Sequence, residues 1–308
     1  MRKIFSFCNQ KGGVGKTTSA VNIATTLAQH GSKVLIVDAD AQANTTSGLG
    51  EEKPSIVFTT FQLLIDNADP NSIIKKTKIE NLFLIPSNAD LSGAELELTN
   101  KLAREFQLKN KISKISDDFD FIFIDCPPSI GLITINALVA SDYIIIPLQC
   151  EYYALEGLGQ LIQSFELVKQ NINKELEIGG VILTMADFRT NLTQQVIEEV
   201  KNYFKNKVFE AVIPRSVKLS EAPSFGQPAV IYDPQNRGSK AYLEAGKEFL
   251  RRFSRKRFDF IGAGSKQQIN AEIKEEEPRE ELGEGIEEME NTETVSNEVG
   301  SNNEEATS

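Results

Sequence analysis

The most informative segment of the chain is Lys11-Gly12-Gly13-Val14-Gly15-Lys16-Thr17-Thr18, which lies between the apolar run Ile4–Asn9 and a helix-like stretch at 17–30. A glycine-rich loop between a strand and a helix binds anions, because backbone N–H groups and the positive end of the helix dipole face the ligand. Glycines let the backbone approach a phosphate without a Cβ clash. Lys16 would reach the β- and γ-phosphates of a nucleotide, and the Thr17 hydroxyl would bind Mg²⁺.

The loop departs from the general pattern G-x-x-x-x-G-K-[ST] at its first position. Gln10 stands where that pattern has its first glycine, and an additional lysine, Lys11, opens the loop. A glycine-rich turn alone would be weak evidence, but this string between a strand and a helix is specific. The residues that we expect to bind the nucleotide are Lys11, Gly12, Gly13, Val14, Gly15, Lys16, Thr17 and Thr18.

The string resembles the deviant Walker A loop of the ParA/MinD family of ATPases, which also includes the nitrogenase iron protein. The resemblance implies that Lys11 is the signature lysine, which reaches across a dimer interface to the ATP of the other subunit. Two ATP molecules would then be enclosed between two subunits. A cation that approaches the developing phosphoryl charge acts as an arginine finger does elsewhere. Lys11 and Lys16 are therefore expected to be catalytic.

Carboxylates follow two further apolar runs. One run ends at Asp38, with Asp40 two residues later, and another ends at Asp125. The carboxyl ends of parallel strands meet at the sheet edge where ligands bind, and Mg²⁺ prefers few carboxylates together with waters and phosphate oxygens. A single aspartate at a strand end can instead cap a helix or a turn. Behind a phosphate loop, we predict that Thr17, Asp38 and Asp125 hold the metal, the two carboxylates through water.

The residues around these aspartates narrow the family. Asp38–Asn44 resembles the D-x-D-P-Q-G-N string of the partition branch, and Asp125–Ser129 resembles its D-x-P-P-S string. The resemblance implies that Asp40 orients or activates the attacking water, and that Asp125 is the Walker B residue. Ala41 replaces a proline and Ala43 a glycine, changes that affect the stiffness of the loop.

A later stretch carries the adenine contacts that the resemblance implies. Val212-Ile213-Pro214-Arg215-Ser216 matches the family at Pro214, whereas Ser216 stands where an asparagine is usual. We expect Pro214 and Ser216 to contact the nucleotide.

Apolar β-rich runs alternate with helix-like stretches over most of the chain. The predicted strands are Ile4–Asn9, Lys33–Asp38, Leu82–Pro86, Phe121–Asp125, Tyr143–Pro147, Gly180–Thr184, Val208–Ile213 and Ala229–Tyr232. The predicted helices lie at about 17–30, 58–66, 92–106, 132–140, 155–171, 192–204 and 239–253. The strands are continuously apolar, as in sheets covered by helices on both faces. The fold class predicted is α/β, with a doubly wound, mainly parallel sheet and helices on both faces.

The charge of the chain is unevenly distributed. The 308 residues carry 33 basic and 44 acidic side chains, a net charge of −11. Residues 262–308 hold fourteen glutamates and three basic residues and account for this whole charge, so residues 1–261 are neutral. The acidic segment has too few apolar residues to offset the conformational entropy that it would lose on folding. We predict an ATPase domain over 1–261 and a disordered acidic tail over 262–308.

A neutral body needs a local basic patch to bind nucleic acid. The resemblance implies DNA-binding roles for Arg189, Arg215 and Lys218, which match cations of partition ATPases. Such contacts would go mainly to phosphates, so binding would depend on salt and little on sequence. A second basic cluster, for which neutralisation of a helix dipole is an equal explanation, comprises Arg251, Arg252, Arg255, Lys256 and Arg257. The acidic tail either competes with DNA for this cluster or only aids solubility.

Composition excludes several classes of protein. The apolar runs fall far short of the ~20 residues of a membrane span, and the run after Lys3 is too short for a secretory signal. With one histidine and the separated Cys8, Cys126 and Cys150, a zinc site is not expected. We interpret the cysteines as buried small apolar residues in a reducing compartment.

The resemblance, over about residues 1–253, implies a ParA/Soj-type partitioning ATPase of a chromosome or plasmid. ATP would close a homodimer, the dimer would bind nonspecific double-stranded DNA, and a ParB-type centromere-binding partner would stimulate slow hydrolysis and release. The implied location is the cytoplasm, on the nucleoid.

Three alternatives remain open. A MinD-like membrane-surface ATPase in cell-division positioning would need a terminal amphipathic helix, which Phe249, Leu250 and Phe253 could imitate. Electron transfer would need cysteines between subunits, and Cys126 lies too close to Asp125 for that. A nucleotide binder without hydrolysis would follow if Lys11 or Asp40 were not productively placed.

Overall fold

The computed structural model describes residues 2–52, 56–151, 154 and 158–254. The predicted tail over 262–308 and the predicted domain boundary lie outside the described residues. Both therefore stay predictions.

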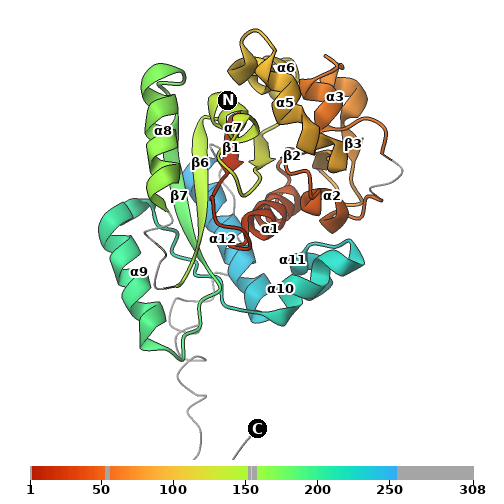
Figure 1. The fold of residues 1–308 in the computed structure, drawn as a ribbon. Helices are drawn as coiled ribbons and strands as arrows, with labels where there is room; N and C mark the ends of the chain where they lie inside the picture. The colour runs from red at the N-terminus through yellow and green to blue at the C-terminus, as the bar shows by residue number, and fades with distance from the viewer. Residues whose placement is uncertain (1, 53–55, 152–153, 155–157, 255–308) are drawn as a thin grey trace, which may run out of the picture. The chain divides into compact units, whose positions relative to one another are not determined.

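A seven-stranded sheet with the order β3-β4-β2-β5-β1-β6-β7 forms the centre of the described part of the chain (Figure 1). The strands are β1 (Lys3–Phe7), β2 (Val34–Asp38), β3 (Lys75–Lys76), β4 (Leu82–Ile85), β5 (Phe121–Asp125), β6 (Tyr143–Gln149) and β7 (Glu177–Thr184). All neighbouring strands are parallel except β3 and β4 at one edge. The mainly parallel sheet predicted from the sequence is confirmed.

The helices pack around this sheet. The α-helices are α1 (Lys16–Gln29), α2 (Asn44–Gly48), α3 (Thr60–Leu64), α4 (Pro70–Ile73), α5 (Ala94–Thr99), α6 (Gln107–Ile112), α7 (Leu132–Ala140), α8 (Gly159–Asn171), α9 (Asn191–Phe204), α10 (Val217–Glu221), α11 (Ala229–Tyr232) and α12 (Arg237–Phe253). The 3₁₀ turns are η2 (Ala89–Gly93), η3 (Arg104–Phe106), η4 (Ser116–Asp118), η6 (Lys205–Lys207) and η7 (Ala222–Phe225). Figure 1 shows α12 (blue) beside α1 (red), its main helical neighbour.

Both faces of the central strands are buried, because successive side chains of a strand point to opposite faces. On one face, Phe249 of α12 contacts the rings of Phe5, Phe121 and Phe123, with centroids 4.6, 5.8 and 5.2 Å away. The intervening residues belong to a second buried cluster with α6 and α7, which includes Ile4, Ile122, Ile124, Ile112 and Leu138. Helices therefore cover both faces, as predicted.

The strand predicted at Val208–Ile213 is wrong. Phe209 and Ile213 donate backbone hydrogen bonds to β7, but only one residue of the segment forms a bridge, Val208 to Val181. Side chains of α12 bind the other backbone groups. Arg252 donates to the carbonyl of Val208 (2.6 Å), and Glu248 accepts from the N–H groups of Glu210 and Ala211.

The strand predicted at Ala229–Tyr232 is also wrong, because this segment forms helix α11. Pro228 precedes it, a residue that suits a helix start, and Asn22 of α1 accepts the N–H of Val230 (3.0 Å). A four-residue apolar run has too little periodicity to separate strand from helix.

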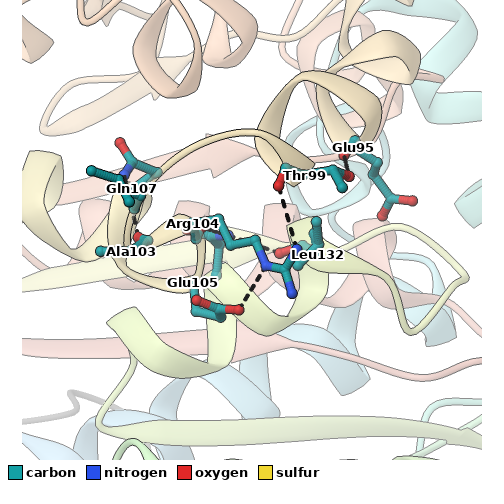
Figure 2. A network of polar contacts seen from close by, with 9 residues as sticks. Glu95, Thr99, Ala103, Arg104, Glu105, Gln107 and Leu132 are labelled. Carbon is teal, nitrogen blue, oxygen red and sulfur yellow. Dashed lines mark hydrogen bonds and ion pairs between the residues drawn. The ribbon is translucent and has the colours of Figure 1, made fainter.

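The helix predicted at 92–106 is broken into η2, α5 and η3. Helix α5 ends at Thr99, and Ala103, directly before η3, adopts φ 49°, a left-handed conformation that a continuous helix does not allow. Figure 2 shows the polar contacts of the break, where Arg104 donates to the carbonyl of Thr99 (3.4 Å) and Gln107 to the carbonyl of Ala103 (3.2 Å).

The packing of α12 on α1 depends on Gly246. A Cβ at Gly246 would lie 2.5 Å from Cγ2 of Thr26, which is fully buried. The Thr26 hydroxyl is held by the carbonyl of Asn22 (2.9 Å), so the side chain cannot rotate away without losing that bond. Overpacking of this kind costs about 1–3 kcal/mol.

We therefore expect Gly246→Ala to lower the free energy of unfolding in urea by about 1–3 kcal/mol, in spite of the better helix propensity of alanine. Gly93→Ala is the matched control, since nothing lies within 4 Å of a Cβ at Gly93. Equal stabilities of the two variants would contradict this account of the interface.

Candidate functional site

The glycine-rich loop joins the end of β1 to the start of α1. Gly13 and Gly15 adopt φ values of 75° and 87°, in the left-handed region that favours glycine. Gly15 precedes α1, and no side chain of the described residues caps the helix N-terminus. The N–H groups of the first turn therefore face the space in front of the loop, which is the arrangement that binds phosphate.

The side chains of Lys16 and Thr17 lie at the base of the loop. Lys16 is only 7% exposed, and its Nζ donates to the carbonyl of Lys11 (3.3 Å). Thr17 Oγ1 donates to Asp125 Oδ2 (2.7 Å). The structure thus brings the loop and the aspartate that ends β5 into direct contact, although 108 residues separate them.

Asp38 and Asp125 lie side by side because β2 and β5 pair in parallel with these residues in register. Both are fully buried. Burial, and then the charge of Asp125, raises the pKa of Asp38 to about 7. Burial likewise raises the pKa of Asp125 to about 6. Two neighbouring buried carboxylates, one of which binds Thr17 of the phosphate loop, form a place where a divalent cation would be stabilised.

The sequence reasoning missed two residues of this site, Thr45 and Thr46 of α2. Thr45 Oγ1 donates to Asp125 Oδ2 (2.8 Å), and Thr46 Oγ1 donates to Asp38 Oδ2 (2.6 Å). Both threonines are fully buried. The sequence carried a signal for them, since hydroxyl residues follow directly on the Asp38–Asn44 string.

Asp40 lies in the loop that leads into α2 and is 9% exposed. Its Oδ1 accepts the N–H of Gln42 (2.9 Å), which fixes the turn. Ala43 adopts φ 53° in the same turn, a conformation that is costly for a residue with a Cβ. Ala43 stands where the partition string has glycine, and its backbone adopts the left-handed conformation that glycine favours.

These parts enclose one cleft with a volume of about 720 Å³. Asp40 and the predicted contact residues Pro214 and Ser216 line it together with Gly12, Gly13, Gly15, Lys16, Thr17 and Thr18 of the phosphate loop. Val14 of the loop is buried and does not line the cleft. The bridge between Ala186 and Pro214 brings the end of β7 to this segment. Lining residues that the sequence reasoning missed are Gln42, Asn44, Ser47, Pro128, Thr184, Met185, Val217, Leu219, Ser220, Pro223 and Tyr242.

Lys11 is placed differently from Lys16. It does not line the cleft, and its half-exposed side chain pairs with Glu151, which follows β6. Asn9 orders the start of the loop, since its Oδ1 accepts the N–H of Lys11 (3.0 Å) and its Nδ2 donates to Pro147 of β6 (2.8 Å). Lys11 is therefore directed toward a carboxylate outside the cleft of its own subunit.

The three predicted DNA-binding residues lie on the segments that follow β7 and the Pro214 bridge. Arg189 is 88% exposed and pairs with both carboxylate oxygens of Asp187 (2.8 and 2.7 Å). Arg189, with a smaller contribution from Arg215, lowers the pKa of Asp187 to about 2. Lys218 of α10 pairs with Glu221 (2.8 Å).

The second basic cluster is not one exposed surface. Arg252 pairs with Glu248 (2.6 Å) and covers the ring of Phe209 at 4.3 Å, so its role is structural, whereas Arg251 is exposed. Arg255, Lys256 and Arg257 lie outside the described residues.

The cysteines are buried and free, as the sequence predicted. Cys8 and Cys126 lie with their sulfur atoms 3.0 Å apart, next to the phosphate loop and Asp125. Across the part of the chain that the structure describes, no helix has the length and apolarity to cross a membrane.

Known proteins are similar to this chain over most of its length. A protein-family model described as an AAA domain matches residues 2–178. The sporulation initiation inhibitor protein Soj of Bacillus subtilis (strain 168) is 54% identical over 248 residues, which cover 80% of this chain and 98% of Soj. The chromosome partitioning protein ParA of Myxococcus xanthus (strain DK1622) is 47% identical over 250 residues, which cover 81% of this chain and 88% of ParA.

Solved structures agree in fold. Cobyrinic acid a,c-diamide synthase from Mycobacterium smegmatis, with bound ADP and magnesium, superposes with a TM-score of 0.73 at 33% identity. The match covers 84% of this chain and 98% of that one. Sequence identity, matched domain and shared fold all agree with the loop and strand-end motifs. The chain therefore belongs to the ParA/Soj family of partitioning ATPases.

Proposed function

We propose that this chain binds ATP with Mg²⁺ in the cleft and closes into a homodimer that binds nonspecific double-stranded DNA. A ParB-type centromere-binding partner then stimulates hydrolysis, which releases the dimer from the nucleoid. The observation that carries the proposal is the cleft itself. It brings Lys16, Asp40 and Pro214 together from three distant segments of the chain.

The residues around Asp125 fit a magnesium ion. Asp125 Oδ1 is buried and accepts no hydrogen bond within the described residues, while Oδ2 binds the hydroxyl of Thr17. An orphaned buried carboxylate oxygen is costly, and a cation near it would remove that cost. Thr17 would hold the ion directly, and Asp38 and Asp125 through its waters. Bound there, magnesium neutralises charge on the phosphates.

Hydrolysis needs a positioned water and a cation near the phosphoryl group. Asp40 lines the cleft in front of the phosphate loop, and it would orient the attacking water. Lys16 would bind the β- and γ-phosphates. Lys11 would exchange Glu151 for the phosphates in the cleft of the other subunit, which explains why it does not line its own cleft. Among the described residues that line the cleft, Asp40 is the only acidic one. An aspartate is a weak base, so we expect slow intrinsic turnover.

The DNA contacts would come from Arg189, Arg215 and Lys218. The pairs of Arg189 with Asp187 and of Lys218 with Glu221 are exposed, and exposed ion pairs contribute only ~0–1 kcal/mol. Phosphates can therefore replace the carboxylates at small cost. A dimer doubles the number of these cations, which gives ATP control over DNA binding.

The MinD-like alternative loses its main support. Phe249 and Leu250 are buried, and the Phe253 ring contacts Phe5 with centroids 4.8 Å apart. These residues of α12 thus pack against the sheet and do not form a lipid-binding face within the described residues.

The first test measures fluorescence anisotropy of an unrelated DNA duplex with ATP, with ADP and without nucleotide, over a salt series. We expect tight, salt-sensitive binding with ATP only, because dimerisation joins the basic residues of two subunits. Lys16→Ala should abolish this binding. Absence of binding in every nucleotide state would overturn the proposal, and anionic vesicles would then test the membrane alternative.

A second experiment locates the DNA surface. Arg189→Ala and Arg215→Ala should each weaken binding to all duplexes alike and reduce the salt slope by about 1. Lys76→Ala is the control, since β3 lies at the opposite edge of the sheet from β7. Asp187→Asn should strengthen binding, because it releases Arg189. Equal losses in Lys76→Ala and Arg189→Ala would exclude this surface.

The carboxylates that would hold the metal also predict a pH effect on the metal-free protein. Burial raises the pKa of Asp38 in the folded protein to about 7, against 3.8 for an unperturbed aspartate. The folded state binds the Asp38 proton more tightly than the unfolded state does. The protonated carboxyl group therefore contributes its full stabilisation below pH 3.8, and this contribution is lost as the pH rises through 7. Asp38→Asn lacks the buried charge, so its free energy of unfolding should exceed that of the wild type more at pH 8 than at pH 6.

Urea denaturation in EDTA at the two pH values measures this difference. Asp187→Asn is the control, because the pKa of Asp187 near 2 leaves it ionised at both. If the difference in free energy of unfolding between Asp38→Asn and the wild type does not change with pH, the raised pKa of Asp38 is contradicted.

A further inference from the structure

We propose that Thr45 and Thr46 of α2 are positioning residues that orient the two metal-site carboxylates and couple them to the Asp40 loop. The inference rests on the proposed function and deepens it, because it assigns residues that set the magnesium affinity of the site. Neither threonine lines the cleft, so each would act through an aspartate.

Thr45 and Thr17 share one acceptor. Both hydroxyls donate to Asp125 Oδ2, at 2.8 and 2.7 Å, one from α2 and one from α1. With both donors on Oδ2, the carboxylate has a single orientation, and Oδ1 is left without a hydrogen bond within the described residues. Thr45 thereby keeps Oδ1 available for a hydrated cation.

Thr46 fixes the other carboxylate. Its N–H and its Oγ1 both donate to Asp38 Oδ2, at 2.8 and 2.6 Å. Its Oγ1 also accepts the N–H of Ser87, which follows β4 (2.9 Å). Because that oxygen accepts from Ser87, its own hydrogen is directed to Asp38.

The same short segment carries Asp40. The N–H of Ala43 donates to the carbonyl of Asp40 (2.9 Å), and α2 begins at the next residue. The Asp40 N–H donates to Asp38 Oδ1 (3.2 Å). A shift of α2 would therefore move Asp40 and release both carboxylates together, so the position of α2 links the metal site to the water-orienting residue.

The competing explanation is that the two hydroxyls only stabilise the fold. Thr60 separates the two explanations. It is buried like Thr45 and Thr46, and its Oγ1 donates to the backbone carbonyl of Asp38 (2.6 Å) and not to a carboxylate. Thr60→Val removes a buried hydrogen bond at the same strand end and leaves the carboxylates untouched.

The experiment titrates a fluorescent ATP analogue into Thr45→Val, Thr45→Ser, Thr46→Val and Thr60→Val, with Mg²⁺ at a series of concentrations and in EDTA. Loss of a residue that orients a metal ligand lowers metal affinity 10- to 100-fold in other proteins. We expect Thr45→Val to raise the half-saturating Mg²⁺ concentration by about tenfold or more, with unchanged affinity in EDTA. Thr45→Ser, which keeps the hydroxyl, should restore the half-saturating Mg²⁺ concentration of the wild type.

Thr46→Val should have a smaller effect, because the backbone N–H of Thr46 still binds Asp38. Thr60→Val should lower stability in urea and leave the Mg²⁺ dependence unchanged. Equal Mg²⁺ dependence in Thr45→Val, Thr60→Val and the wild type would overturn the inference. If the wild type binds no ATP analogue, the proposed function fails instead, so the two failures are distinct.

Discussion

The structure depends on the in-register parallel pairing of β2 with β5. This pairing places Asp38 beside Asp125, both fully buried, at the edge of the sheet where the phosphate loop ends. Burial raises the pKa of both carboxyl groups, and the charge of Asp125 raises the pKa of Asp38 further. The hydroxyls of Thr17, Thr45 and Thr46 offset part of the cost of burying these carboxylates. Asp125 Oδ1 still accepts no hydrogen bond within the described residues, which makes the site suited to a cation.

Helix α12 supports the site from a distance. Phe249 packs on β1 and β5 through three ring contacts, and Glu248 and Arg252 bind the backbone that follows η6. This backbone continues to Pro214 and completes the cleft. Tyr242 of α12 also reaches Ser19 of α1 (3.0 Å). One helix thus holds the phosphate loop and the far wall of the cleft to the same sheet.

Three of the cations assigned to phosphate share one feature. Lys11, Arg189 and Lys218 each pair with a carboxylate on the surface. Such pairs are weak because water screens them, and a nucleotide or DNA phosphate competes for the same donors. Lys16 differs, since it is buried and bound to a carbonyl within its own loop. The cations that would act between molecules are therefore exchangeable, and the one that would act within the subunit is held in place.

The phosphate loop, the strand-end aspartates and most of the sheet could be predicted from the sequence, because they depend on local pattern: a glycine-rich loop, apolar runs and the residues that follow them. The roles of residues from distant segments depend on tertiary contacts. Apolar content could not show that Ala229–Tyr232 is a helix and Val208–Ile213 is not a strand, since side chains of α1 and α12 bind their backbones. Nor could it assign Thr45 and Thr46, because a hydroxyl acquires a role only when folding brings a carboxylate within 3 Å.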